Sequence, residues 1–202
     1  MVVQAGADAI GLVFYPPSPR YVTPEKAGEL VRNVPPFVTV VGLFVNPQED
    51  DIHAVLKHVP LQMLQFHGDE MPEQCAALAA AANISFVKAY RVKPDTSAVD
   101  LLECESQFRL GSPLFRGLLL DTYVDGYGGS GKVFDWSLVP KELAPQVVLS
   151  GGLSVQNVAG ALSQIRPFAV DISSGVELAK GIKDEEKVRA FIAAVRQADQ
   201  TY

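Results

Sequence analysis

Three residues near the middle of the chain have the spacing of a phosphate-binding P-loop. Gly126, Gly131 and Lys132 match the pattern G-x-x-x-x-G-K. The next residue in a P-loop is Ser or Thr, whose hydroxyl binds Mg²⁺, but here it is Val133. In addition, a P-loop glycine turn follows its strand directly, whereas TYVD separates these glycines from the apolar run before them. The stretch is therefore not expected to bind a nucleotide.

Two charged residues that follow apolar runs could act on a small acidic substrate. Asp121 ends the run RGLLLD, where desolvation favours the neutral carboxyl and suits it to general acid catalysis. It could instead cap its loop by accepting backbone hydrogen bonds. Arg20 lies in the proline-rich segment YPPSPRYV and could bind a substrate carboxylate, or it could be a solvated surface arginine.

Two further polar residues stand at the ends of other apolar runs. His67 follows LQMLQF, and Asp171 lies in FAVDIS. We expect both to lie near Asp121, because the carboxyl ends of parallel strands meet at one edge of a sheet. His53 and His58 belong to a polar helix face and are expected to be solvated.

Glycine and serine follow the last two apolar runs. SGGL places Gly151 and Gly152 before a helix that Ser154 is expected to cap, and DISSGVE places Ser173, Ser174 and Gly175 at the start of a short helix. Free N–H groups at helix starts attract anions, and glycine lets a phosphate come close. The pattern predicts a phosphate site, although these glycines could merely permit tight turns.

Apolar runs and helix-like segments alternate along the whole chain. The runs are 9–14, 38–45, 61–66, 84–90, 116–121, 146–151 and 168–173. Several are apolar on both faces, as buried parallel strands are. Segments between them carry helical periodicity, and TPEKAGELVRNV opens with Thr23 as an N-cap and Pro24 in the first turn. We predict a single α/β domain over residues 1–202 with a parallel sheet.

The runs favour a (β/α)8 TIM barrel in which one strand–helix unit is not seen. Glycine recurs at the run ends, as it does at the active-site face of barrels. The segment VVQAGA resembles the end of a helix, which in a barrel follows a strand. An open sheet of seven strands is the alternative. We favour a barrel that lacks its first strand in this chain.

The composition of the chain limits the kinds of partner that it is expected to bind. The chain has 202 residues, a net charge of −6 and no long basic run, which argues against nucleic acid and anionic membranes as partners. Cys75 and Cys104 lie in helix-like segments without a C-x-x-C spacing, so both are expected to be reduced and structural. These features, with no signal peptide visible, predict a cytoplasmic protein.

Several of these segments together resemble the phosphoribosylanthranilate isomerase family. They are GADAIGLVFYPPSPRYV, VGLFVN, LQFHGDE, LLLDT, YGGSGKVFDWSL, LSGGL and RPFAVDISSGVE. The resemblance implies an Amadori rearrangement of N-(5-phosphoribosyl)anthranilate in tryptophan biosynthesis, with a small phosphorylated substrate and neither a metal nor an organic cofactor. It also implies that YGGSGKVFDW is a loop that closes over the substrate.

The resemblance implies a role for each candidate residue. Asp121 matches the general acid that opens the sugar ring, and Arg20 matches the residue that binds the anthranilate carboxylate. His67 and Asp171 match positions that line the anthranilate and ribose side of the pocket. The phosphate loops correspond to Gly151, Gly152, Ser173, Ser174 and Gly175.

One family feature has no counterpart in this sequence. The family's first strand reads approximately K-[IV]-C-G, and its cysteine is the general base. Nothing before MVVQAGADA matches it, so we expect little activity from these 202 residues, and self-association through two unpaired strand edges. A non-catalytic ligand-binding fragment is a second interpretation. Another phosphate-binding barrel enzyme is a third, which is disfavoured because no lysine or metal-binding histidine pair stands at the strand ends.

Overall fold

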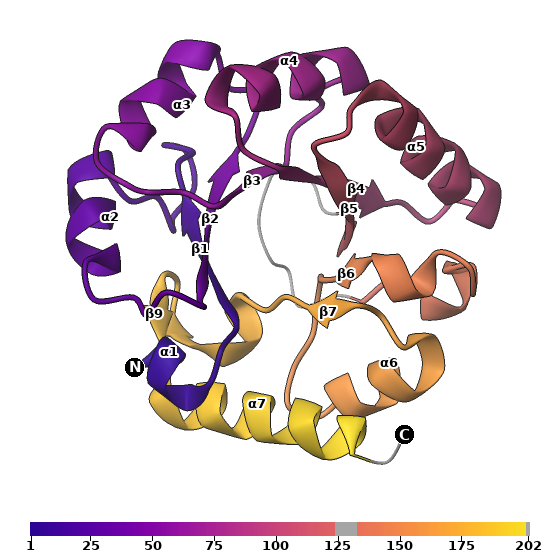
Figure 1. Cartoon of the computed structure of the whole chain (residues 1–202). Helices are drawn as coiled ribbons and strands as arrows, with labels where there is room; N and C mark the ends of the chain where they lie inside the picture. Colours follow the sequence, from indigo (N-terminus) through magenta and orange to yellow (C-terminus); the bar gives the residue numbers. More distant parts are fainter. Residues whose placement is uncertain (124–132, 201–202) are drawn as a thin grey trace.

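Seven parallel strands form one sheet in the computed structural model, which describes residues 1–123 and 133–200. They follow one another in chain order, each hydrogen-bonded to the next, and curve into an arc with the helices on its outside (Figure 1). The strands are β1 (Ala9–Val13), β2 (Thr39–Phe44), β3 (Met63–Phe66), β4 (Phe86–Val92), β5 (Phe115–Thr122), β6 (Val148–Leu149) and β7 (Ala169–Val170). This arrangement confirms the predicted barrel class.

Every predicted strand is present, but the last two are short. The runs 146–151 and 168–173 contribute only Val148–Leu149 and Ala169–Val170 to the sheet. Within the described residues, β2 is the only named strand that pairs with β1, apart from a single parallel bridge between Val13 and Tyr21, and β7 pairs only with β6. These two strands are therefore the edges of the sheet.

Helices connect the strands. They are α1 (Val2–Ala5), α2 (Pro24–Val31), α3 (Glu49–Leu56), α4 (Pro72–Ala82), α5 (Ala98–Gly111), α6 (Val158–Ile165) and α7 (Glu185–Asp199). The predicted cap of α2 is confirmed, because the Thr23 hydroxyl accepts a hydrogen bond from the Lys26 N–H at 3.3 Å. Helix α1 ends at Gly6 in the left-handed conformation and packs beside α7 (Figure 1). None of the described helices is both long and apolar enough to cross a membrane.

Helix α5 was predicted only as a helix-like segment around Cys104. Its apolar pattern is weak, since only Leu101 and Phe108 are buried along its length. Its start is set locally instead. Ser97 accepts a hydrogen bond from the Asp100 N–H, and the Asp100 carboxylate accepts one from the Ser97 N–H.

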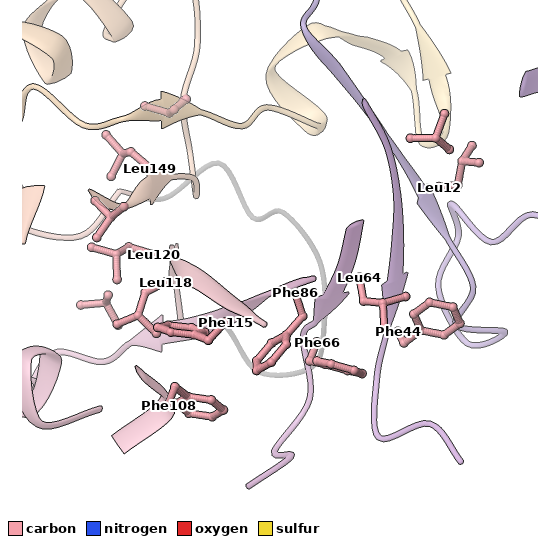
Figure 2. Packing of buried hydrophobic residues seen from close by; sticks show 14 of the residues in the cluster. Leu12, Phe44, Leu64, Phe66, Phe86, Phe108, Phe115, Leu118, Leu120 and Leu149 are labelled. Atoms are coloured by element: carbon pink, nitrogen blue, oxygen red, sulfur yellow. The ribbon is translucent and has the colours of Figure 1, made fainter. Parts of the chain in front are cut away.

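The hydrophobic core lies between the sheet and the surrounding helices. Phe86 on β4 contacts Phe66 on β3 and Phe115 on β5, with ring centroids 5.5 and 5.6 Å apart, and Phe108 reaches it from α5 (Figure 2). Strand side chains alternate between two faces. Because Phe66 and Phe86 face the helices, Gln65 and Val87 must face the inside of the arc.

A small hairpin follows the main sheet. It consists of β8 (Glu177–Ala179) and β9 (Ile182–Lys183), which pair antiparallel, with Glu177 opposite Lys183. The short 3-10 helix η3 (Ser174–Val176) leads into it, which confirms the short helix predicted at DISSGVE. Two further 3-10 turns, η1 (Trp136–Leu138) and η2 (Ala144–Gln146), connect β5 to β6.

Candidate active site

His67 and Asp121 meet inside the arc. The His67 Nε2 atom lies 3.2 Å from the Asp121 Oδ2 atom, and the two side chains are only 12% and 18% exposed. His67 directly follows β3, and Asp121 is near the end of β5. The structure therefore brings together two of the residues that the sequence predicted, at the carboxyl ends of their strands.

Gln65, which the sequence analysis did not select, orients the His67 ring. Its Nε2 atom lies 2.9 Å from the His67 Nδ1 atom. An amide N–H can only donate, so in this arrangement Nδ1 accepts and the ring hydrogen is on Nε2, directed at Asp121. The sequence carried a signal for this residue, because in a strand a polar residue two positions before His67 shares its face.

Asp171 lies at the end of β7 and is held by Ser150, which follows β6. The Ser150 hydroxyl donates a hydrogen bond of 2.8 Å to the Asp171 Oδ2 atom. Desolvation by the surrounding residues raises the pKa of the Asp171 carboxyl although the residue as a whole is exposed, the Ser150 hydrogen bond lowers it in part, and the nearby Asp121 raises it further. Asp171 therefore shares an electrostatic environment with Asp121, as its place in the sequence predicted.

The two predicted phosphate loops contact each other. Gly151 and Gly152 have φ of +79° and +69°, in the left-handed region that favours glycine. Gly175 lies so close to the Leu153 carbonyl that an added Cβ would be 2.2 Å from its oxygen. The described residues offer no hydrogen-bond acceptor to the backbone N–H groups of Gly152, Ser173, Ser174 and Gly175.

One detail of this region was predicted wrongly. Ser154 does not cap the following helix, because α6 begins at Val158 and its N-cap residue is Asn157. The Asn157 Oδ1 atom accepts a hydrogen bond of 2.8 Å from the Ser154 N–H, and its side-chain amide donates one of 3.0 Å to the Gly152 carbonyl. The sequence pattern placed the helix start too early, since the longer Asn side chain organises this turn.

Arg20 is not a solvated surface arginine. Its Nε and Nη2 atoms each donate a hydrogen bond of 2.7 Å to the Glu177 carboxylate, and its side chain is 13% exposed. The Arg20 guanidinium lowers the pKa of the Glu177 carboxyl to about 2, with a smaller contribution from Lys183. Glu177 is the last residue of the segment DISSGVE, but the sequence did not identify it as a site residue.

A buried ion pair supports the loop that carries His67. The Lys88 ammonium donates 2.9 Å and 2.6 Å hydrogen bonds to the Glu70 carboxylate and the Gly68 carbonyl. Glu70 in turn accepts hydrogen bonds from the backbone N–H groups of Asn46 and Gly68. The segments that follow β2 and β3 are thereby joined to Lys88 in β4.

The remaining predictions concern residues outside this cluster. Gly126, Gly131 and Lys132, which have the P-loop spacing, lie outside the described residues, as does most of the predicted closing loop. Cys75 and Cys104 lie on α4 and α5, as predicted. Burial raises the pKa of Cys75 to about 12 and that of Cys104 to about 11.

Parallel strands inside a layer of helices, with polar residues gathered at the carboxyl ends of the strands, define a TIM-barrel enzyme. The N-(5'phosphoribosyl)anthranilate (PRA) isomerase family model matches residues 1–194. The chain belongs to this family, whose members are isomerases of tryptophan biosynthesis.

Individual relatives are similar over almost the whole chain. The N-(5'-phosphoribosyl)anthranilate isomerase of Herminiimonas arsenicoxydans is 63% identical over 197 residues, which are 98% of this chain and 87% of the relative. The Ralstonia nicotianae isomerase of the same name is 55% identical, with 98% of this chain and 86% of the relative covered.

Solved structures show the same fold. The phosphoribosyl anthranilate isomerase of Thermotoga maritima superimposes with a TM-score of 0.83 at 42% identity, covering 97% of this chain and 91% of that one. A second isomerase structure, with 38% identity, a TM-score of 0.78 and the same coverage, is a complex with reduced 1-(o-carboxyphenylamino)-1-deoxyribulose 5-phosphate.

Proposed function

We propose that this chain forms the active site for the Amadori rearrangement of N-(5-phosphoribosyl)anthranilate to the aminodeoxyribulose phosphate. The observation that carries the proposal is the pairing of Asp121 with His67 inside a fold of this family. An isomerase of this pathway is also expected to be cytoplasmic.

Asp121 is assigned the role of general acid. Ring opening needs a proton on the ribose ring oxygen, and the Asp121 carboxyl, near the carboxyl end of β5 on the inside of the arc, is placed to supply one. The Asp121 Oδ2 atom is hydrogen-bonded to the His67 Nε2 atom. The Asp121 Oδ1 atom, which accepts no hydrogen bond from a described residue, is the oxygen we assign to proton delivery.

Arg20 and the glycine turns are assigned to the two anionic ends of the substrate. Arg20 binds the anthranilate carboxylate, and the free N–H groups of Gly152 and Ser173–Gly175 bind the phosphate, while Gly151 forms the turn. His67 and Asp171 line the ribose between them. The ligand in the solved isomerase complex carries both a carboxylate and a phosphate, which supports two such subsites.

The general base is the one role that we assign to no described residue. The buried thiols of Cys75 and Cys104 hold their protons at neutral pH because their pKa values are raised to about 12 and about 11. Both also lie on helices outside the arc. We therefore expect the 202 residues by themselves to bind the reduced product but to turn substrate over very slowly, since a general base contributes roughly 10²–10⁴ in rate.

Binding and turnover should be measured on the same material, with its mass confirmed. Calorimetry with the reduced product tests the binding assignment, and substrate consumption tests the chemistry. Absence of binding would reject the proposed function. Near-normal turnover would show that a residue of this chain acts as the base and would reject only the statement about activity.

A further inference from the structure

Glu177 holds Arg20 in a fixed orientation. The two residues are 157 positions apart, yet two hydrogen bonds of 2.7 Å join the guanidinium to the carboxylate. The Glu177 side chain is only 5% exposed. Such paired contacts fix the plane of the guanidinium as well as its position.

Lys183 connects the same carboxylate to the proposed phosphate loop. Its ammonium lies 3.3 Å from the Glu177 Oε1 atom and donates a 2.9 Å hydrogen bond to the Ser173 carbonyl. The register of the β8–β9 hairpin places Lys183 opposite Glu177. Lys187 on α7 additionally donates to the Glu177 carbonyl at 2.9 Å. The Lys183 ammonium therefore lies between the Glu177 carboxylate and the Ser173 carbonyl.

The hairpin also packs against the segment that carries Arg20. Gly181, at the turn of the hairpin, has φ of +82°, and a Cβ added there would be 3.3 Å from the Pro19 carbonyl oxygen. The Arg20 loop thus contacts the hairpin through both its backbone and its side chain.

The geometry leaves part of Arg20 available to a ligand. Glu177 takes one N–H on Nε and one on Nη2, which are two of the five N–H donors of a guanidinium. The Nη1 group and the second hydrogen of Nη2 form the adjacent edge, which donates no side-chain hydrogen bond to a described residue and has the spacing to bind a second carboxylate. A ligand carboxylate can therefore bind without displacing Glu177.

We propose that Glu177 is a positioning residue that directs the remaining N–H groups of Arg20 toward the substrate carboxylate. The proposal rests on the proposed function, because it assumes that Arg20 binds the anthranilate carboxylate. It predicts that Glu177 controls selectivity for carboxylated ligands without touching them.

Comparing the binding of two ligands distinguishes a positioning role of Glu177 from a general contribution to the stability of the fold. One is reduced 1-(o-carboxyphenylamino)-1-deoxyribulose 5-phosphate, and the other is its phenylamino analogue, which lacks the carboxylate. Their dissociation constants are measured by calorimetry for the wild type, Glu177→Gln, Arg20→Met and the control Glu185→Gln. Glu185 pairs with Arg189 on the exposed face of α7, so its variant removes a carboxylate of similar type far from Arg20.

The wild type and Glu185→Gln should prefer the carboxylated ligand, and Arg20→Met should lose that preference. Glu177→Gln should reduce the ratio of the two dissociation constants at least about tenfold, which corresponds to roughly 1.4 kcal/mol. Its affinity for the phenylamino analogue should change less than about threefold. If Glu177→Gln does not fold, Glu177→Asp, which shortens the side chain by one methylene, should reduce the preference in the same direction.

Two outcomes would overturn the inference while leaving the proposed function intact. In one, Glu177→Gln keeps the wild-type preference. In the other, Glu177→Gln weakens the binding of both ligands by the same factor, which indicates a purely structural role. A wild type without preference, or an Arg20→Met variant that retains it, would reject the role of Arg20 itself and the inference with it.

Discussion

The His67 Nε2 atom lies 3.2 Å from the Asp121 Oδ2 atom, although β4 separates the strands from which these residues extend. Neighbouring strands are about 4.8 Å apart, so β3 and β5 are roughly 10 Å apart. Only a sheet curved as in a barrel lets side chains of next-nearest strands meet on its inner face. Curvature of the sheet thus creates the pair.

Asp121→Asn tests the acid at the centre of this pair. The amide keeps the size and can still accept a hydrogen bond from His67, but it cannot deliver a proton. In a form of the protein that turns substrate over, we expect kcat to fall roughly 10²–10⁴-fold with little change in KM. Asp199→Asn, on the exposed end of α7, is the matched control. Unchanged kcat, where chemistry limits turnover, would remove Asp121 from the mechanism.

Gln65→Glu tests how the His67 ring is oriented. In the wild type, the Gln65 amide donates to Nδ1, so the ring hydrogen is expected on Nε2. A carboxylate at this position can only accept, so it favours a hydrogen on Nδ1. The nitrogen chemical shift of Nδ1 should therefore change from that of an unprotonated to that of a protonated ring nitrogen. The signals of the more exposed His53 and His58 should not move, and a His67 signal that stays with them would contradict the assignment.

Phosphate binding should depend on the glycine turns and not on Lys132, which lies outside the described residues. Lys132→Ala should leave the affinity for the reduced product within several-fold. Gly175→Ala should weaken it strongly, because its Cβ would lie 2.2 Å from the Leu153 carbonyl oxygen and must displace one loop. A loss of more than about 100-fold with Lys132→Ala, roughly 2.7 kcal/mol, would place the phosphate at the P-loop-like segment instead.

Asp171→Asn should stabilise the folded chain at neutral pH. Desolvation raises the pKa of the Asp171 carboxyl, so the folded state loses stability as the pH rises through the folded pKa, and the loss is small because the residue is exposed to solvent. The asparagine variant avoids this loss and can still accept the Ser150 hydrogen bond. The difference in free energy of unfolding should be small below about pH 4 and should grow toward pH 7. A variant less stable than the wild type at pH 7 would show that the charged carboxylate is well compensated.

The edges of the sheet predict self-association. Strand β1 lies at one edge of the sheet, where Ala9 and Gly11 are exposed, and unpaired edges recruit other strands. Sedimentation of the 202-residue chain should show species that grow with concentration. Gly11→Lys should reduce them, because an added side chain meets nothing within 4 Å there and a charge opposes edge pairing. A monomer over the whole concentration range would reject this prediction.

Local sequence determined the elements and the order of the candidate residues. The apolar runs predicted every strand of the sheet, because residues buried on both faces of a parallel strand need no alternation. Thr23 predicted the start of α2 because capping depends on residues three positions apart. The same locality explains why Asp121, His67 and Asp171 could be selected: each follows an apolar run directly, and parallel strands end at one edge.

The tertiary structure decided which side chains are partners. Nothing in the sequence links Arg20 to Glu177, or Ser150 to Asp171, since these contacts join segments 157 and 21 residues apart and depend on strand pairing and loop packing. Ser154 was misassigned as a cap because a serine before a helix is a common local signal, whereas the turn formed by Gly152 and Asn157 moves the helix start to Val158. Residue types and strand ends are set by neighbours along the chain, while hydrogen-bond partners depend on how the strands and loops pack in three dimensions.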